Sequence, residues 1–171
     1  SINGEGNMIV ISSNSTSKVI IYRLDNTNTW VPETINDTDN PLPDYLSVSV
    51  DYYGNRIVLS GYSDNCYIYN KVSDEKWKQT WFNAKAKIIC INKSNDTTKD
   101  GTIVAYYLGN FLYVVKESSG NWISYGEPIP DIEQVKVIHL NSLGDILVFI
   151  SDTRCYVYKY MTEKWSKVSE L

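Results

Sequence analysis

Short apolar runs recur along this chain of 171 residues, and each follows a turn that contains glycine. The clearest runs are MIVIS (8–12), RIVLS (56–60) and ILVFI (146–150), and a weaker one is IVAYY (103–107). These runs are rich in β-branched residues, and their apolar side chains occupy consecutive positions. The pattern indicates short β-strands that are covered on both faces.

A second set of runs alternates more openly between apolar and polar positions. Each leads through a short polar turn to a segment that starts around a tryptophan, and these runs are VIIYRL (19–24), YIYNK (67–71), LYVVKE (112–117) and YVYKYM (156–161). One more strand is expected before each later glycine, at 45–50, 87–92 and 135–140. No segment has a convincing helical period, so four strands in simple succession predict an antiparallel up-and-down meander.

The glycine and the tryptophan mark four copies of one unit. The anchors are Gly6 and Trp30, Gly54 and Trp77, Gly101 and Trp122, and Gly144 and Trp165. From glycine to tryptophan the separations are 24, 23, 21 and 21 residues, and successive tryptophans are 47, 45 and 43 residues apart. A period above 40 residues is typical of repeat architectures, in which each unit buries its apolar face against the next.

Radial stacking of four-stranded meanders predicts an all-β protein of the β-propeller type with about four blades. The alternative is a sandwich or prism of meanders. The 171 residues are expected to form one domain, with repeats at about 1–44, 45–86, 87–134 and 135–171. Each tryptophan is expected to close its blade by packing against a neighbouring blade.

The repeats resemble known propeller families. DYYGNRIVLSG (51–61) and NGEGNMIVIS (3–12) look like the heads of WD-like and FG-GAP-like repeats. IYRLDNTNTW, IYNKVSDEKW and VYKYMTEKW look like the tyrosine-to-tryptophan segment of kelch repeats. A Trp-Asp dipeptide that closes the third strand and a Gly-Gly doublet that ends the second are both missing. The resemblance implies a propeller that serves as a scaffold or interaction surface, and a fold alone does not set a function.

The first blade is expected to lack a strand, because only SING precedes its turn. Three arrangements then remain open, since propellers have about four to eight blades. A small ring closes on itself, two chains share a larger ring, or missing sequence completes the circle. The chain starts at Ser1 without a methionine, which favours a processed or truncated chain.

Composition and charge limit the partners. The net charge is −4 with mixed signs, and no apolar run approaches the ~20 residues of a membrane span, so neither nucleic acid nor a membrane is expected. Cys66 and Cys155 occupy equivalent places in different repeats and are not expected to pair, which favours a reducing compartment such as the cytoplasm, or a virion. Abundant Asn, Tyr, Ile and Lys suggest an AT-rich coding sequence, as in large DNA viruses.

Catalytic, metal and cofactor chemistry finds little support in the sequence. His139 is the single histidine and falls in a predicted strand, so a site with two or three histidines is excluded within the chain. Glu33, Asp37, Asp39 and Asp44 gather in one polar loop rather than across a cleft. The segment NDTTKDG (95–101) lacks the alternating acids of a calcium loop and is interpreted as a long turn. We expect no enzyme activity, no metal and no cofactor.

A binding function is therefore the main prediction. In a meander the loops after the second and fourth strands emerge on one face, and aromatic residues in or beside them are candidate contacts: Tyr45, Tyr62, Trp81, Phe82 and Tyr125. The favoured function is a protein–protein interaction or scaffold module, bound to a partner protein or to itself. The alternative is a lectin-like propeller that binds glycans through aromatic pockets.

Overall fold

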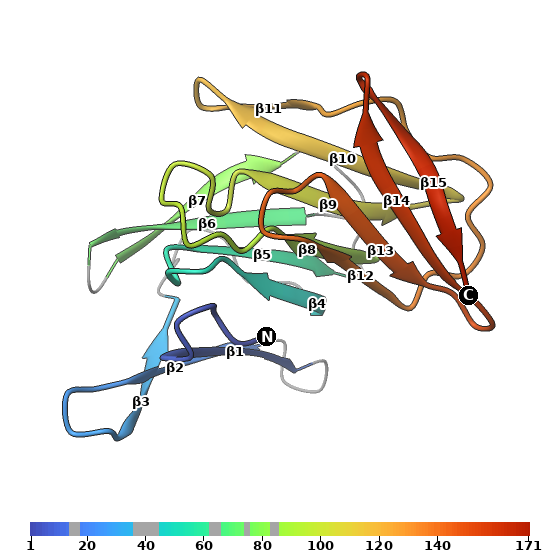
Figure 1. Ribbon diagram of the computed structural model, residues 1–171. Helices are drawn as coiled ribbons and strands as arrows, with labels where there is room; N and C mark the ends of the chain where they lie inside the picture. The colour runs from blue at the N-terminus through green and yellow to red at the C-terminus, as the bar shows by residue number, and fades with distance from the viewer. Residues whose placement is uncertain (14–17, 36–44, 62–65, 74–75, 83–85) are drawn as a thin grey trace.

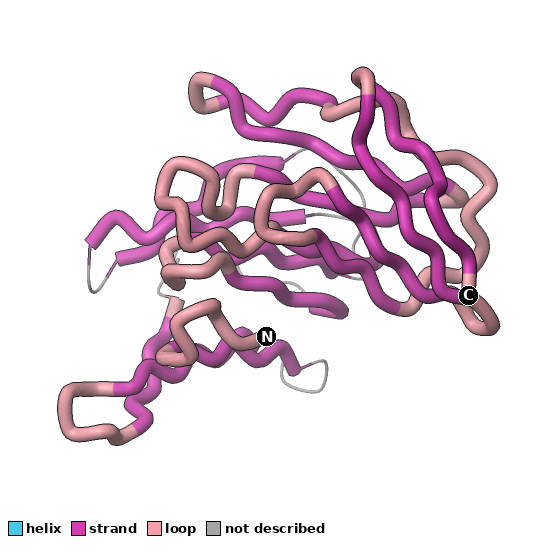
Figure 2. The backbone as a smooth tube through the Cα atoms, viewed as in Figure 1, coloured by secondary structure: helices cyan, strands magenta, loops and turns pink. Residues whose placement is uncertain are grey.

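The structure is a computed structural model that describes residues 1–13, 18–35, 45–61, 66–73, 76–82 and 86–171. Its regular elements are fifteen β-strands, and no helix occurs in this part of the chain (Figures 1 and 2). Among the same residues no helix is available that could cross a membrane. The strands form four antiparallel sheets, which we number as blades one to four in chain order.

The blades contain three, four, four and four strands. Blade one comprises β1 (Met8–Ser13), β2 (Lys18–Leu24) and β3 (Trp30–Thr34). Blade two comprises β4 (Tyr45–Val50), β5 (Arg56–Gly61), β6 (Cys66–Ser73) and β7 (Lys76–Phe82). Blade three comprises β8 (Ile88–Ile91), β9 (Ile103–Leu108), β10 (Phe111–Ser118) and β11 (Asn121–Ser124). Blade four comprises β12 (Val137–Leu140), β13 (Ile146–Ile150), β14 (Cys155–Met161) and β15 (Lys164–Glu170).

This arrangement confirms the predicted all-β, propeller-type array with an incomplete first blade. In every blade, strands that follow one another along the chain are hydrogen-bonded neighbours. Blade one has only a remnant of an innermost strand: Ile2 forms an isolated bridge with Ile9, and the Val10 amide donates to the Ser1 carbonyl over 2.8 Å.

The hydrophobic cores lie between blades, because each sheet presents apolar side chains on both faces. One core joins blades one and two, with Met8 and Val10 packed against the β5 and β6 side chains Ile57, Leu59 and Tyr69. A second core joins blades two and three, and a third joins blades three and four. The first or innermost strands pack in the sequence β1, β4, β8 and β12, so the blades follow one another in an arc (Figure 1).

Three of the four anchor tryptophans pack against the preceding blade, as predicted. Trp77 is 4% exposed in the core between blades one and two, and its Nε1 donates to Glu33 over 2.7 Å. Trp165 is 9% exposed in the core between blades three and four, and its Nε1 donates to the Tyr125 carbonyl. Trp122 is half-buried, and the Arg56 guanidinium lies 5.5 Å from its ring.

Trp30 departs from the prediction that each tryptophan packs against a neighbouring blade. It occupies the same place in blade one, but its side chain is 39% exposed. Equivalent tryptophans contact the blade before their own, and the described chain has no blade before blade one. Trp30 therefore has no preceding blade among the described residues to pack against.

An Asx side chain, buried in the first three blades and half-buried in blade four, closes the turn that leads into β1, β5, β9 and β13. The Oδ1 atom of Asn3 accepts from the Asn7 and Met8 amides, and that of Asn141 accepts from the Asp145 and Ile146 amides. In the middle blades, Asn92 accepts from the Ile103 amide and Asp51 from the Asn55 amide. Such side-chain bonds fix the turn together with its backbone hydrogen bonds, such as that from the Gly144 amide to the Asn141 carbonyl.

The space around each turn glycine shows whether another blade packs against that turn. Gly144 has φ +70°, and a Cβ there would lie 2.3 Å from Cδ1 of Ile103 in blade three. Gly6 has φ +73°, and a Cβ there would meet no heavy atom within 4 Å. The turn of blade four thus presses on its neighbour, whereas the turn of blade one faces open space.

We predict that Gly144→Ala destabilises the protein more than Gly6→Ala. Both alanines suffer the left-handed backbone, at a cost of about 1–2 kcal/mol. Only the first also overpacks a blade contact, which adds roughly 1–3 kcal/mol. Urea unfolding of both variants measures the difference, and equal losses would contradict the view that the two turns differ in their neighbours.

Candidate interaction surfaces

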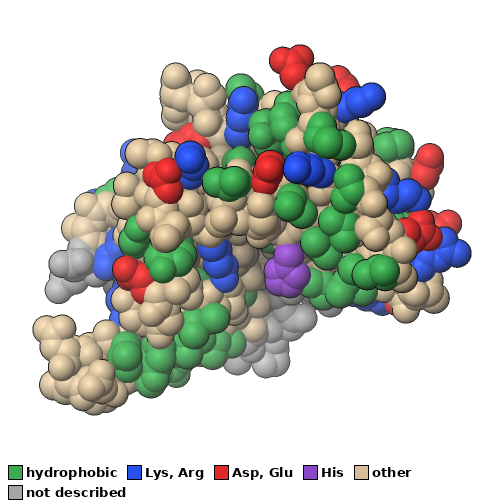
Figure 3. All heavy atoms as spheres, viewed as in Figure 1, with side chains coloured by type: hydrophobic (Ala, Val, Ile, Leu, Met, Phe, Trp, Pro, Cys, Tyr) green, Lys and Arg blue, Asp and Glu red, His purple; other side chains and the backbone are tan. Residues whose placement is uncertain are grey.

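Blade one has an apolar face against which no other blade of the described residues packs, and we call it the blade-one end face. Met8 and Val10 point into the core between blades one and two, so side chains one position away point to the opposite side. The strand register places the following side chains on that side: Ile2, Ile9, Ile11, Ile20, Tyr22 and Trp30. Ile11 is 46% exposed, and Figure 3 shows hydrophobic side chains gathered over β1 and β2.

Blade four has a matching free face at the other end of the arc, which we call the blade-four end face. Leu147 and Phe149 point into the core with blade three, and their neighbours along β13 point away from it. The face comprises Val137, His139, Ile146, Val148, Ile150, Cys155, Val157 and Lys159. Ile150 is 41% exposed, and hydrophobic side chains cover β12 to β14 in the same view (Figure 3).

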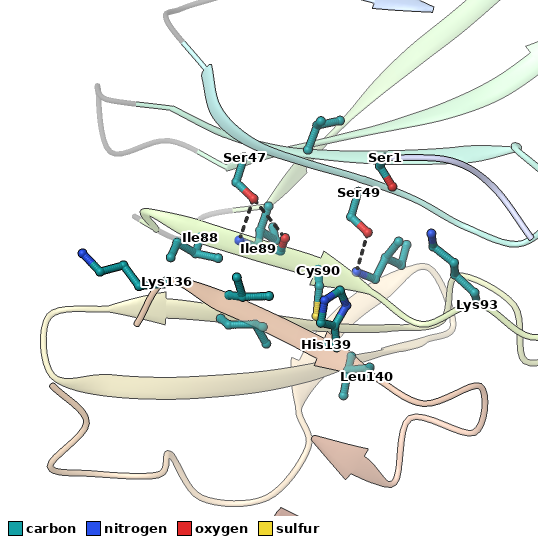
Figure 4. Close-up of a pocket in the computed structure, with 14 residues that line it drawn as sticks. Ser1, Ser47, Ser49, Ile88, Ile89, Cys90, Lys93, Lys136, His139 and Leu140 are labelled. Carbon is teal, nitrogen blue, oxygen red and sulfur yellow. Dashed lines mark hydrogen bonds between the residues drawn. The ribbon is translucent and has the colours of Figure 1, made fainter. Parts of the chain in front are cut away.

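A pocket of about 380 Å³ lies along the inner edges of β4, β8 and β12 (Figure 4). Serines bridge the first two of these strands, since the Ile89 and Ile91 amides donate to the hydroxyls of Ser47 and Ser49 over 3.4 and 3.3 Å. Hydrogen bonds to serine hydroxyls thus join β4 to β8, in place of the backbone–backbone hydrogen bonds that join strands within a blade. The pocket thus lies where the first strands of blades two, three and four meet.

Lysines provide the charge at this pocket. Lys93 is half-buried, its Nζ donates to the Ile2 carbonyl over 2.5 Å, and burial lowers the pKa of its ammonium. Lys136 lies at the rim and pairs with Asp152 at 3.1 Å. Burial raises the pKa of the Cys90 thiol to about 12, so this thiol stays protonated and a poor nucleophile at neutral pH.

The catalytic candidates that the structure describes, His139 and Glu33, do not lie together in a reactive group. His139 lies on β12 at the pocket, exposed, in register with Val148. Glu33 pairs with Arg23 within blade one and accepts a hydrogen bond from Trp77 of blade two, while Asp37, Asp39 and Asp44 lie outside the described residues. No group of three or more His, Cys, Asp or Glu within the described ranges is placed to hold a metal ion.

The segment 95–101 lies between β8 and β9, where the sequence places a long turn. Its Asp100 carboxylate accepts from the amides of Tyr52 and Tyr53 at 2.8 and 3.1 Å. Asp100 thus joins this turn to blade two, so its carboxylate has a structural role.

The predicted aromatic contacts are only partly described. Tyr125 is half-buried and stacks on Tyr160 with ring centroids 3.9 Å apart, so it helps to join blades three and four. Trp81 and Phe82 pair with Tyr67 and Cys66 in the β6–β7 ladder, and Tyr45 starts β4, but the side chains of these three aromatic residues are not described. Tyr62 lies outside the described residues. Their role in binding stays a prediction.

Sequence reasoning missed the two end faces as candidate sites. Ile11 and Val148 belong to the same kind of strand as the buried core residues, so composition gives them no distinguishing mark. The sequence feature that pointed to exposed end faces was the number of predicted strands, because blades that do not close into a ring leave one face free at each end. All three cysteines are free, as expected, with Cys66 and Cys90 buried.

No protein-family model and no curated protein matches this sequence. Solved structures match its fold. The β-propeller domain of Cps50 (Swd1) from Myceliophteria thermophila aligns over 100% of this chain and 53% of its own, with a TM-score of 0.67 and 13% identity. A protein from Lactobacillus plantarum aligns over 96% of this chain and 52% of its own, with a TM-score of 0.65 and 11% identity.

A third structure, hydrazine synthase from Kuenenia stuttgartiensis, aligns over 99% of this chain and 47% of its own, with a TM-score of 0.63 and 16% identity. At such low identities these likenesses establish the fold and carry no activity across. The chain spans about half the length of each of the three structures. It is an all-β protein built as an arc of propeller blades.

Proposed function

We propose that this chain is a non-catalytic protein-interaction module whose binding surfaces are its two end faces. The observation that carries the proposal is the contrast between Trp30 and Trp77. They occupy the same place in successive repeats, yet one is 39% exposed and the other 4%. An aromatic side chain surrounded by exposed aliphatic ones is the usual centre of a protein interface.

The chemistry of the end faces supports a protein rather than a small polar ligand as the partner. They are sheet faces made largely of isoleucine and valine, with Tyr22 and Trp30 on the blade-one end face and the polar side chains of His139 and Lys159 on the blade-four end face. Burying such surfaces yields about 25 cal/mol per Å² of apolar area, so a large flat partner gains most. Contacts through the loop residues Tyr45, Tyr62, Trp81, Phe82 and Tyr125 remain a second proposed surface.

Alkylation of engineered cysteines tests this function in the protein isolated under native conditions with its partners. Ile11→Cys reports on the blade-one end face, and Val72→Cys, 53% exposed in blade two, is the matched control. We expect Ile11→Cys to react at least roughly tenfold more slowly than Val72→Cys, because a bound protein excludes the reagent. Equal rates would mean that the end face is bare in the assembly and would overturn the proposal.

A further inference from the structure

We infer that the partner of each end face is the opposite end face of a second copy of this chain, so that two copies close one ring. The inference rests on the proposed function and names its partner. In the closed ring, blade one of each copy packs against blade four of the other.

The first step is that the blade-one end face repeats one half of a contact already present in the chain. In the core between blades one and two, blade two contributes Val50, Ile57, Leu59, Tyr69 and Trp77. Counted from the Asx turn, the turn glycine and the anchor tryptophan, the same places in blade one are held by Ile2, Ile9, Ile11, Tyr22 and Trp30. The blade-one end face is thus built to pack onto a preceding blade.

The second step is that the blade-four end face repeats the other half of that contact. Blade one offers Met8, Val10, Val19 and Ile21 to blade two. The equivalent places in blade four are held by Ile146, Val148, Cys155 and Val157, on the side away from blade three. The two free faces are therefore complementary: the blade-one end face supplies Trp30, and the blade-four end face is built to receive it.

A cation of one blade lies near the anchor tryptophan of the next blade at two contacts, from neighbouring cross-strand places: Arg23 is in register with Met8, and Arg56 holds the place of Met8 in blade two. The Arg23 guanidinium of blade one lies 6.0 Å from the Trp77 ring of the next blade, and Arg56 of blade two lies 5.5 Å from the Trp122 ring. Lys159 on β14 holds the place in blade four that Arg23 holds in blade one. In the ring of two copies this cation meets Trp30 of the other copy, which favours the same cation–π contact.

The third step concerns closure. Head-to-tail contacts form a closed ring when the rotation per chain divides the circle, and otherwise they form filaments. This chain aligns with about half of each matched structure, 53% of the Swd1 propeller domain among them. In the inferred ring, two copies of the 171-residue chain supply about this length, and a two-fold axis between the copies relates them. The resulting count of eight blades lies within the usual range for propellers.

The mass of the purified 171-residue chain in solution tests the inference. At ~100 µM we expect the mass of two 19.6 kDa chains. Ile11→Asp and Ile150→Asp change side chains that are 46% and 41% exposed in the single chain, so each should leave the fold intact, as circular dichroism and thermal unfolding will report. Each should reduce the mass to one chain, whereas Val72→Asp should leave it unchanged.

Charge complementation tests the register between copies. A chain with both Ile11→Lys and Ile150→Lys places like charges at both contacts of its own ring, and so does a chain with both Ile11→Asp and Ile150→Asp. We expect each variant alone to have the mass of one chain and an equimolar mixture to have that of two, since only the mixture pairs opposite charges at both contacts. A mixture that stays at the one-chain mass would overturn the inference.

The proposed function and the ring can fail separately. A wild-type chain that keeps a one-chain mass at ~100 µM would reject the second copy as partner. If Ile11→Cys is still protected in the native isolate, another partner covers the blade-one end face and the proposed function stands for that face. A two-chain mass that survives Ile11→Asp and Ile150→Asp together would place the dimer contact elsewhere and would also overturn the inference.

Discussion

Trp77→Ala is expected to lower the free energy of unfolding by about 3–5 kcal/mol, the usual loss for truncating a buried tryptophan. The indole is 4% exposed, its Nε1 donates to Glu33 over 2.7 Å, and the Arg23 guanidinium lies 6.0 Å from the ring. Truncation empties the centre of the core between blades one and two and leaves Glu33 with one partner fewer. Urea unfolding followed by far-UV circular dichroism measures the loss.

Trp30→Ala is the matched control, because it removes the same side chain from the same place in the preceding repeat. The indole is 39% exposed, so the loss should be under about 1 kcal/mol in a solution dilute enough to hold single chains. A loss as large as that of Trp77→Ala would show that Trp30 is packed within its own chain, which contradicts the end-face assignment.

The period and the strand pattern were sufficient to predict the fold. The run 45–50 coincides with β4, and the runs after Gly6, Gly54, Gly101 and Gly144 became β1, β5, β9 and β13. These elements are readable because strand alternation and turn chemistry are local, and because four copies repeat the same signal. The missing strand of blade one could be predicted because the other three copies show where that strand should be.

The exposure of Trp30 could not be read from the repeat, because its sequence surroundings match those of Trp77. Whether a tryptophan is buried depends on the blade that precedes it in space. The Asx turns carried a local signal that the sequence analysis overlooked: Asn3, Asp51 and Asn141 each stand three residues before the turn glycine. In blade three the separation from Asn92 to Gly101 is nine residues, which hid the common position.

The candidate contacts among the aromatic residues were harder to judge from sequence. Tyr125 belongs to a segment between β11 and β12, yet its ring packs against Tyr160 and its carbonyl accepts from Trp165, 40 residues away. Such long-range contacts leave no trace in local composition. The sequence therefore predicted the architecture, whereas the binding role of the aromatic residues stays a prediction.

Asp51→Asn is expected to stabilise the protein by about 2 kcal/mol at pH 7.5 and to have little effect at pH 4. Asp51 is 3% exposed, and burial, with a further contribution from the charge of Asp100, raises the pKa of its carboxyl to about 6. The other three blades hold a neutral asparagine at this position: Asn3, Asn92 and Asn141. An amide at 51 keeps the oxygen that accepts from the Asn55 amide and removes the buried charge.

The direction of the pH dependence follows from proton binding. The folded chain holds the Asp51 proton up to about pH 6, whereas the unfolded chain releases it near the ordinary value of 3.8. Stability from this group is therefore complete below about pH 4 and is lost as the pH rises through 6, by up to about 3 kcal/mol. The difference in unfolding free energy between wild type and Asp51→Asn isolates this group from the other carboxyls.

The reverse exchange in blade four completes the comparison. Asn141→Asp puts a carboxylate where the Asn141 amide now donates to Asp145 over 2.7 Å, so it adds like-charge repulsion to a part-buried turn. We expect a loss of about 1–3 kcal/mol at pH 7.5 that shrinks toward pH 4, the opposite sign to Asp51→Asn. If Asp51→Asn destabilises at pH 7.5 instead, the carboxylate is needed in its charged form, and blade two relies on a contact that an amide cannot replace.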